Sequence, residues 1–146
     1  VGALLAEAPE DDAQFLYDFG INLGMAFQLR DDMLDVYGDP AVFGKKIGGD
    51  ILSNKKTYLL IQALRKSTPG QMEELNKWLA AKDFDPEEKI KAVTALYDEI
   101  DVRSLCEDRI SHYTLLAETN LDMVKVQEEK KQPLIDEMNK LMLREV

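Results

Sequence analysis

The chain has 146 residues, of which 45% are hydrophobic and 32% charged, and its 18 basic and 28 acidic residues give a net charge of -10. A chain of this length and composition can bury a core without disulfides or a structural metal, and it is not of the disordered class. The negative charge argues against nucleic acid as a partner, and the lack of a run of about 18 apolar residues argues against a stable membrane anchor. The single Cys106 excludes an intrachain disulfide and fits a reducing, cytoplasmic location.

The first predicted element is a long helix over about residues 12–36, where apolar side chains recur at steps of three and four. Gly20 and Gly24 leave a slim face on this helix that another helix could approach closely. Residues 37–49 contain half of the 8 glycines and are predicted as a loop. Helical periodicity then resumes from about residue 53 to residue 66.

Capping signals mark the later helices. Thr68-Pro69-Gly70-Gln71 is a capping box ahead of a helix to about residue 81, and Asp85 followed by proline starts another that reaches about residue 99. A periodic stretch covers about residues 101–126, and Pro133 is predicted as the first residue of the last helix. No stretch alternates for long enough to form a strand. The predicted fold class is therefore all-α, with residues 1–146 as a single helical unit.

Three aspartates stand close together near the end of the first long helix. Asp31 and Asp35 are four residues apart and Asp32 and Asp35 three apart, so their carboxylates project from one helix face. Like charges at these spacings repel, and the helix dipole disfavours anions near a C-terminal end. A bound cation would offset both effects, and an oxygen-only ligand set favours magnesium. The alternative is a solvated acidic face in an acidic chain.

Two pairs of lysines follow these carboxylates in the sequence. Gly44-Lys45-Lys46 and Lys55-Lys56 bring ammonium groups, and the glycine-rich segment Gly48-Gly49-Asp50 lies between them. Carboxylates that hold magnesium beside lysines suit a diphosphate, whose oxygens bind both kinds of cation. The spacings fit neither a Walker A loop nor an EF-hand.

The complete string resembles a known family. It consists of Phe27-Gln28-x-x-Asp31-Asp32-x-x-Asp35, then Gly38-Asp39, Gly44-Lys45, Gly48-Gly49-Asp50-Ile51 and Lys55-x-Thr57. In this order it resembles the second aspartate-rich region of the trans-isoprenyl diphosphate synthases, the polyprenyl synthetase family that includes farnesyl and geranylgeranyl diphosphate synthases.

The resemblance implies an isoprenoid-synthase-type antiparallel helical bundle, of which this chain is only the C-terminal half. It implies a magnesium-dependent prenyltransferase that condenses isopentenyl diphosphate with an allylic diphosphate to make a longer prenyl diphosphate, as a homodimer when full length. The chain has no initiator methionine and no counterpart of the family's first aspartate-rich motif. We therefore expect a portion of a longer protein, preceded by an absent N-terminal half and inactive on its own.

The resemblance also implies roles for individual residues. The metal ligands are expected to be Asp31, Asp32 and Asp35. The diphosphate contacts are expected from Lys45 or its neighbour Lys46 and from Lys55, with Gln28 near the reacting carbons and Asp50 supporting the metal or the lysines. The catalytic set is then Gln28, Asp31, Asp32, Asp35, Lys45 and Lys55.

Two other functions stay open from the sequence. One is a terpene cyclase-like or inactive paralogue that binds diphosphates without condensing them. The other is a non-enzymatic, acidic helical interaction module whose aspartates are only solvated. His112, Cys106 and Trp78 are each interpreted as surface or packing residues, because none has the partners of a catalytic group nearby in the sequence.

Overall fold

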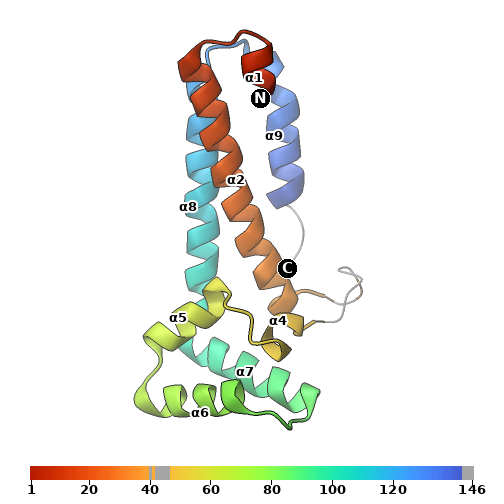
Figure 1. Cartoon of the computed structure of the whole chain (residues 1–146), viewed down its shortest axis with the longest axis vertical. Helices are drawn as coiled ribbons and strands as arrows, with labels where there is room; N and C mark the ends of the chain where they lie inside the picture. Colours follow the sequence, from red (N-terminus) through yellow and green to blue (C-terminus); the bar gives the residue numbers. More distant parts are fainter. Residues whose placement is uncertain (40, 42–46, 143–146) are drawn as a thin grey trace. The chain divides into compact units, whose positions relative to one another are not determined.

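The computed structural model describes residues 1–39, 41 and 47–142, and the elements in Figure 1 are α-helices. Their bounds are α1 Gly2–Leu5, α2 Glu10–Tyr37, α4 Gly49–Leu52, α5 Tyr58–Lys66, α6 Pro69–Ala80, α7 Pro86–Ile100, α8 Val102–Met123 and α9 Glu128–Met142. The described ranges contain no strand, which confirms the all-α prediction. They separate into two compact units, residues 1–28 with 109–142 and residues 29–108, so α2 and α8 contribute to both. That residues 1–146 are one unit of a larger domain stays a prediction.

Side-chain caps explain where three of the helices begin. Thr57 Oγ1 accepts a hydrogen bond from Leu60 N at 3.2 Å and caps α5. The predicted capping box of α6 is present, with Thr68 N donating to Gln71 Oε1 at 3.0 Å. Asp85 caps α7 through a 2.9 Å bond from Glu88 N. Each cap satisfies a backbone N–H that has no partner within its helix.

Two predicted helix starts were wrong. The helix expected from about residue 53 begins later, at Tyr58, and a separate short helix, α4, ends before it at Leu52; Asn54, with a left-handed φ of 53°, lies between the two. The last helix begins at Glu128, so Pro133 lies inside it rather than at its first position. Lys131 stabilises the first turn of α9, because its buried Nζ donates to Asp122 O at 3.2 Å and to Glu128 Oε1 at 3.0 Å.

The first unit has its own small core. Phe19 of α2, Ala117 and Leu121 of α8 and Met138 of α9 are buried together. Polar contacts add to this packing, since Asn22 Nδ2 donates to the Asn120 side chain at 2.8 Å. One apolar cluster therefore holds α2, α8 and α9 together in this unit.

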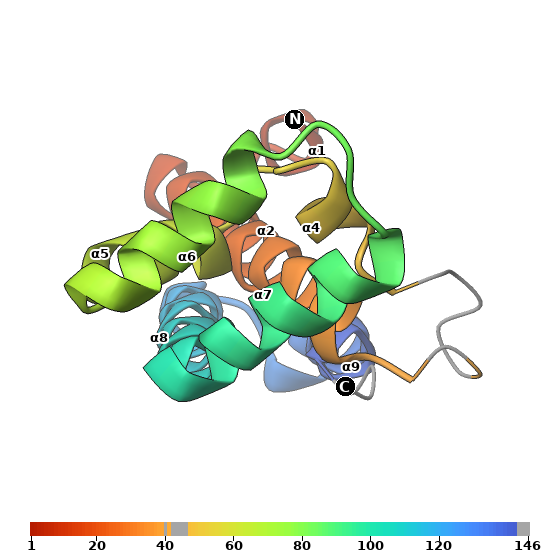
Figure 2. The same cartoon turned by 90° about the horizontal axis from the view of Figure 1, so that it is seen from below.

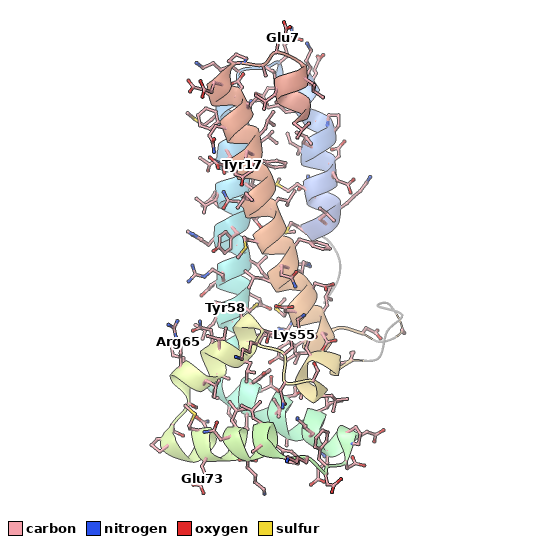
Figure 3. All side chains as sticks on the ribbon, in the orientation of Figure 1. Glu7, Tyr17, Lys55, Tyr58, Arg65 and Glu73 are labelled. Carbon is pink, nitrogen blue, oxygen red and sulfur yellow. The ribbon has the colours of Figure 1, made fainter. Side chains whose placement is uncertain are left out.

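One face of α2 in the first unit is exposed. Tyr17, Ile21 and Met25 are 63%, 51% and 42% exposed, and Tyr17 projects from α2 in Figure 3. A Cβ placed on Gly20 or Gly24 would meet nothing within 4 Å. The close helix approach that these glycines allow is thus not used by any described part of the chain.

In the second unit α7 packs against α4, α5 and α6, and Figure 2 shows these four helices from below. The buried apolar residues of these helices include Ile51 of α4, Leu59, Leu60 and Ala63 of α5, Leu75 of α6 and Val93, Leu96 and Tyr97 of α7. Cys106 is also fully buried, as predicted, and burial raises the pKa of its thiol to about 12. This packing holds the segment between α4 and α5, which carries Lys55.

Within the described ranges, no helix combines the length and the apolar character that crossing a membrane requires.

Candidate functional site

An ammonium group lies between two carboxylates in the second unit. Lys55, labelled in Figure 3, belongs to the segment between α4 and α5. Its Nζ donates to Asp32 Oδ1 of α2 and to Asp50 Oδ2 of α4, both at 3.0 Å. The Asp32 side chain is only 9% exposed, whereas that of Lys55 is 46% exposed. The hydrogen bonds to Asp50 and Asp32 raise the pKa of Lys55, so this group is a cation at neutral pH.

The end of α2 holds the start of α4 in place. Asp50 N donates to Asp35 Oδ2 at 2.8 Å, and Gly48 N donates to Asp35 O at 2.6 Å. Gly48 has a φ of 89°, which a residue with a side chain rarely adopts. The tight turn at Gly48 therefore sets α4 against α2, and this places Asp50 beside Lys55 and Asp35.

Asp35 carries a carboxylate in an unfavourable environment. Burial raises its pKa, and the negative charges of Asp50 and Asp31 raise it further. The backbone hydrogen bond from Asp50 and the positive charge of Lys55 act in the opposite direction without cancelling the increase. A nearby cation would favour the charged form of Asp35.

The other predicted site residues are placed less completely. Asp31 is partly exposed on α2, within electrostatic reach of Asp35. Gln28 is exposed on α2 and falls in the first unit. Lys45 and Lys46 lie outside the described residues. The structure thus joins Asp32, Asp35, Asp50 and Lys55 in one network, and the roles assigned to all these residues stay predictions.

The donor set fits magnesium held jointly with a ligand. Among the described residues, no three acidic, histidine or cysteine side chains are arranged to hold a metal by themselves. Magnesium is usually bound through one or two carboxylates together with water and substrate phosphates, so it does not require such a cage. The adjacent carboxylates of Asp31 and Asp35 supply hard oxygen ligands whose mutual repulsion a divalent cation would relieve.

Two residues of this region were missed in the sequence. Asn54 precedes Lys55, and Lys89 of α7 has no exposed surface. The Lys89 Nζ donates to Asn54 Oδ1 at 2.7 Å. A signal for Lys89 was present, because it precedes Val93 and Leu96 by four and seven residues and so lies on the apolar stripe of its helix.

Comparison with known proteins covers the part of the chain that carries this network. The polyprenyl synthetase family model matches residues 1–97, which include every carboxylate and lysine of the site. The chain belongs to the polyprenyl synthetase family. The resemblance seen in the aspartate and lysine string is therefore confirmed.

Individual polyprenyl synthetases are similar over part of their length. A farnesyl pyrophosphate synthase of Rattus norvegicus is 44% identical over 85 residues, which are 58% of this chain and 23% of that protein. The Homo sapiens farnesyl pyrophosphate synthase is 40% identical over 102 residues, 67% of this chain and 23% of that protein. The chain thus spans about a quarter of these relatives.

A solved polyprenyl synthetase structure shares the fold. The geranylgeranyl pyrophosphate synthase of Corynebacterium glutamicum, complexed with isoprenyl diphosphate and magnesium, has a TM-score of 0.85 and 32% identity, and the match covers 98% of this chain and 40% of that chain. The isoprenoid-synthase fold predicted from the sequence is accordingly confirmed for the described part of the chain.

The environment of Asp35 leads to a testable effect on stability. The pKa of Asp35 is higher in the folded chain than its ordinary value of 3.8. The free energy of unfolding therefore decreases as the pH rises from about the ordinary pKa through the raised one. We expect Asp35→Asn, which keeps the acceptor for Asp50 N, to increase the free energy of unfolding at neutral pH without magnesium. Urea unfolding should show this gain shrinking below about pH 3. Magnesium should stabilise the unsubstituted chain more than the variant.

The matched control is Asp83→Asn, an exposed aspartate in the loop between α6 and α7. It should leave the free energy of unfolding unchanged at both pH values. A loss of stability in Asp35→Asn at neutral pH would contradict the electrostatic interpretation.

Proposed function

We propose that this chain is the diphosphate-holding portion of a magnesium-dependent prenyltransferase. The whole protein would condense isopentenyl diphosphate with an allylic diphosphate to form a longer prenyl diphosphate and release pyrophosphate. The observation that carries the proposal is the Lys55 ammonium between Asp32 and Asp50, next to Asp35, in a chain of the polyprenyl synthetase family. Its relatives include farnesyl and geranylgeranyl diphosphate synthases, which supports the same reaction.

In this proposal Asp31, Asp32 and Asp35 hold magnesium against the allylic diphosphate. When bound, magnesium supplies positive charge to oxygens that become more negative as the allylic C–O bond breaks. Lys55 supplies a further cation to these oxygens, and Asp50 keeps its ammonium in place. Lys45 or Lys46 would contact the same diphosphate, and Gln28 would lie near the reacting carbons.

The electrostatics of the network suit this role. Breaking the C–O bond transfers an electron pair to the departing pyrophosphate, so fixed cations stabilise the transition state more than the ground state. Lys55 acts as a charge and hydrogen-bond donor, because its raised pKa opposes loss of its proton at neutral pH. The described network needs no protein nucleophile for this step.

The direct test is titration calorimetry of residues 1–146 with pyrophosphate, with and without magnesium. We expect magnesium-dependent binding that Asp31→Asn weakens by about tenfold or more, because it removes one charged ligand at nearly constant volume. In the longer protein the same substitution should strongly depress turnover. Equal binding with and without magnesium would contradict the proposal, and no binding in either case would favour the interaction-module alternative.

The isolated chain provides a second measurement. Supplied with magnesium, isopentenyl diphosphate and geranyl diphosphate, it should form no prenyl diphosphate longer than the geranyl substrate, because residues 1–146 contain no counterpart of the family's first aspartate-rich motif. Multiple turnover by this chain alone would show that the active site has been misplaced. A homodimer and a cytoplasmic location stay predictions.

A further inference from the structure

Lys89 is a cation with no exposed surface in the first turn of α7, at the start of an apolar helix face. It shares the buried side of α7 with Val93, Leu96 and Tyr97. Its Nζ lies 4.3 Å from the centroid of the Phe84 ring and donates a 2.7 Å hydrogen bond to Asn54 Oδ1. Burial lowers the pKa of Lys89, which reflects the cost of keeping its ammonium away from water.

Asn54, the hydrogen-bond partner of Lys89, forms a backbone turn next to the site. Asn54 has a φ of 53°, a left-handed conformation that asparagine tolerates better than most residues. Its side-chain Nδ2 donates to Leu79 O of α6 at 3.0 Å, while its Oδ1 accepts from Lys89. Asn54 thus joins the segment between α4 and α5 to both α6 and α7.

Asn54 immediately precedes Lys55, whose ammonium lies in the site. Lys55 N donates to Asp50 O at 3.0 Å, and Lys55 Nζ reaches Asp32 and Asp50 from the same residue. A cavity lined by Asp50, Asn54, Lys55 and Lys89 among others measures only about 10 Å³, at most the space of one water molecule. Movement of Asn54 would therefore be transmitted to Lys55.

Folding stability alone does not account for a lysine at this position. Burying a charged group without an oppositely charged partner costs free energy, and even buried ion pairs can often be replaced by apolar side chains of similar volume with a neutral or stabilising effect. Methionine, at about the same length, would continue the apolar stripe of α7. The amide of Asn54 is the specific feature that Lys89 engages and that methionine could not.

We propose that Lys89 is a positioning residue, which holds the Asn54 side chain so that the adjacent Lys55 ammonium bridges Asp32 and Asp50. The expected effect of Lys89 on diphosphate binding rests on the proposed function, whereas the expected effect of Lys89 on the Lys55 ammonium does not. Lys89 itself makes no contact with the carboxylates in the described structure and acts through Asn54.

The experiment measures the Lys55 ammonium directly in the 146-residue chain. Its ¹⁵N-ammonium signal can be assigned by its loss in Lys55→Arg. Hydrogen exchange of this signal should accelerate about fivefold or more in Lys89→Met and in Asn54→Ala, which corresponds to losing one hydrogen bond. The Lys89→Met chain should remain as resistant to urea as the unsubstituted chain.

A matched control is available on the same helix. Lys91 is exposed, and Lys91→Met should leave the Lys55 signal unchanged. The double variant Lys89→Met/Asn54→Ala should exchange no faster than Asn54→Ala, because Asn54→Ala already removes the acceptor of Lys89 together with the bond to Leu79 O. If Lys89→Met does not fold, Asn54→Ala with Lys89 intact still tests the connection.

Magnesium pyrophosphate titration of the same proteins separates the two proposals. We expect Lys89→Met to weaken binding about fivefold and Lys91→Met to leave it unchanged. A folded Lys89→Met or Asn54→Ala chain with an unchanged Lys55 signal would overturn the positioning role. If the unsubstituted chain does not bind magnesium pyrophosphate but Lys55 exchange responds as expected, the proposed function fails and the positioning role is supported.

Discussion

Lys55→Ala is expected to lower the affinity for magnesium pyrophosphate by about tenfold to a hundredfold, the loss of one charge-assisted hydrogen bond. Within the described network, Lys55 supplies the cation, and its ammonium lies 3.0 Å from Asp32 Oδ1 and from Asp50 Oδ2. Its removal takes away a donor to the diphosphate and leaves two carboxylates facing each other across the vacated position. Titration calorimetry on the purified variant measures the affinity.

The same variant should lose stability without ligand, because Asp32 is largely buried and loses its counter-charge. The pKa of Lys55 is raised in the folded state, so its stabilising contribution is complete below its ordinary pKa and declines only as pH rises through the raised value. Urea unfolding should therefore show the same loss at about pH 6 and about pH 9.

Lys82→Ala is the control for this effect. Lys82 is an exposed lysine of the second unit, in the loop between α6 and α7. Its removal changes the net charge by the same amount but touches no carboxylate of the site. Equal losses of affinity in the two variants would show that overall charge, rather than Lys55, governs the binding.

Gly48→Ala should destabilise the chain by about 2–5 kcal/mol, the sum of left-handed backbone strain and overpacking. Gly48 has a φ of 89°, and a Cβ there would lie 2.5 Å from Ile90 Cδ1 and 2.6 Å from Ile90 Cγ1. Relief would require a shift of the Ile90 side chain or of the backbone that donates to Asp35 O. Affinity for magnesium pyrophosphate should fall together with the urea midpoint, because Asp50 is placed by this turn.

Two further variants separate the causes of this effect. Gly70→Ala, near the start of α6, meets no atom within 4 Å and should stabilise the chain by about 0.5–1 kcal/mol. Ile90→Ala should make the Gly48 substitution less costly by removing the overlap, while the backbone strain remains. A Gly48→Ala chain as stable as the unsubstituted one would contradict the turn described here.

Local physical chemistry made much of the helical organisation predictable. Thr68, Gln71 and Asp85 act within a few residues of their own helices, so their caps can be read from sequence order. The helical register likewise predicted that Asp31 and Asp35 interact. Boundaries that depend on distant contacts were not predictable, as Lys131 of α9 shows by bonding to Asp122 O in α8.

The sequence by itself determined the helical class, the starts of the capped helices α6 and α7, and the family through its aspartate and lysine string. Only the tertiary structure decided that Lys55 joins Asp32 to Asp50 and that Lys89 reaches Asn54. The reason is that periodicity and capping act over three or four residues, whereas these contacts join α2, α4 and α7. They form only when the chain turns at Gly48 and Asn54 and packs these helices together.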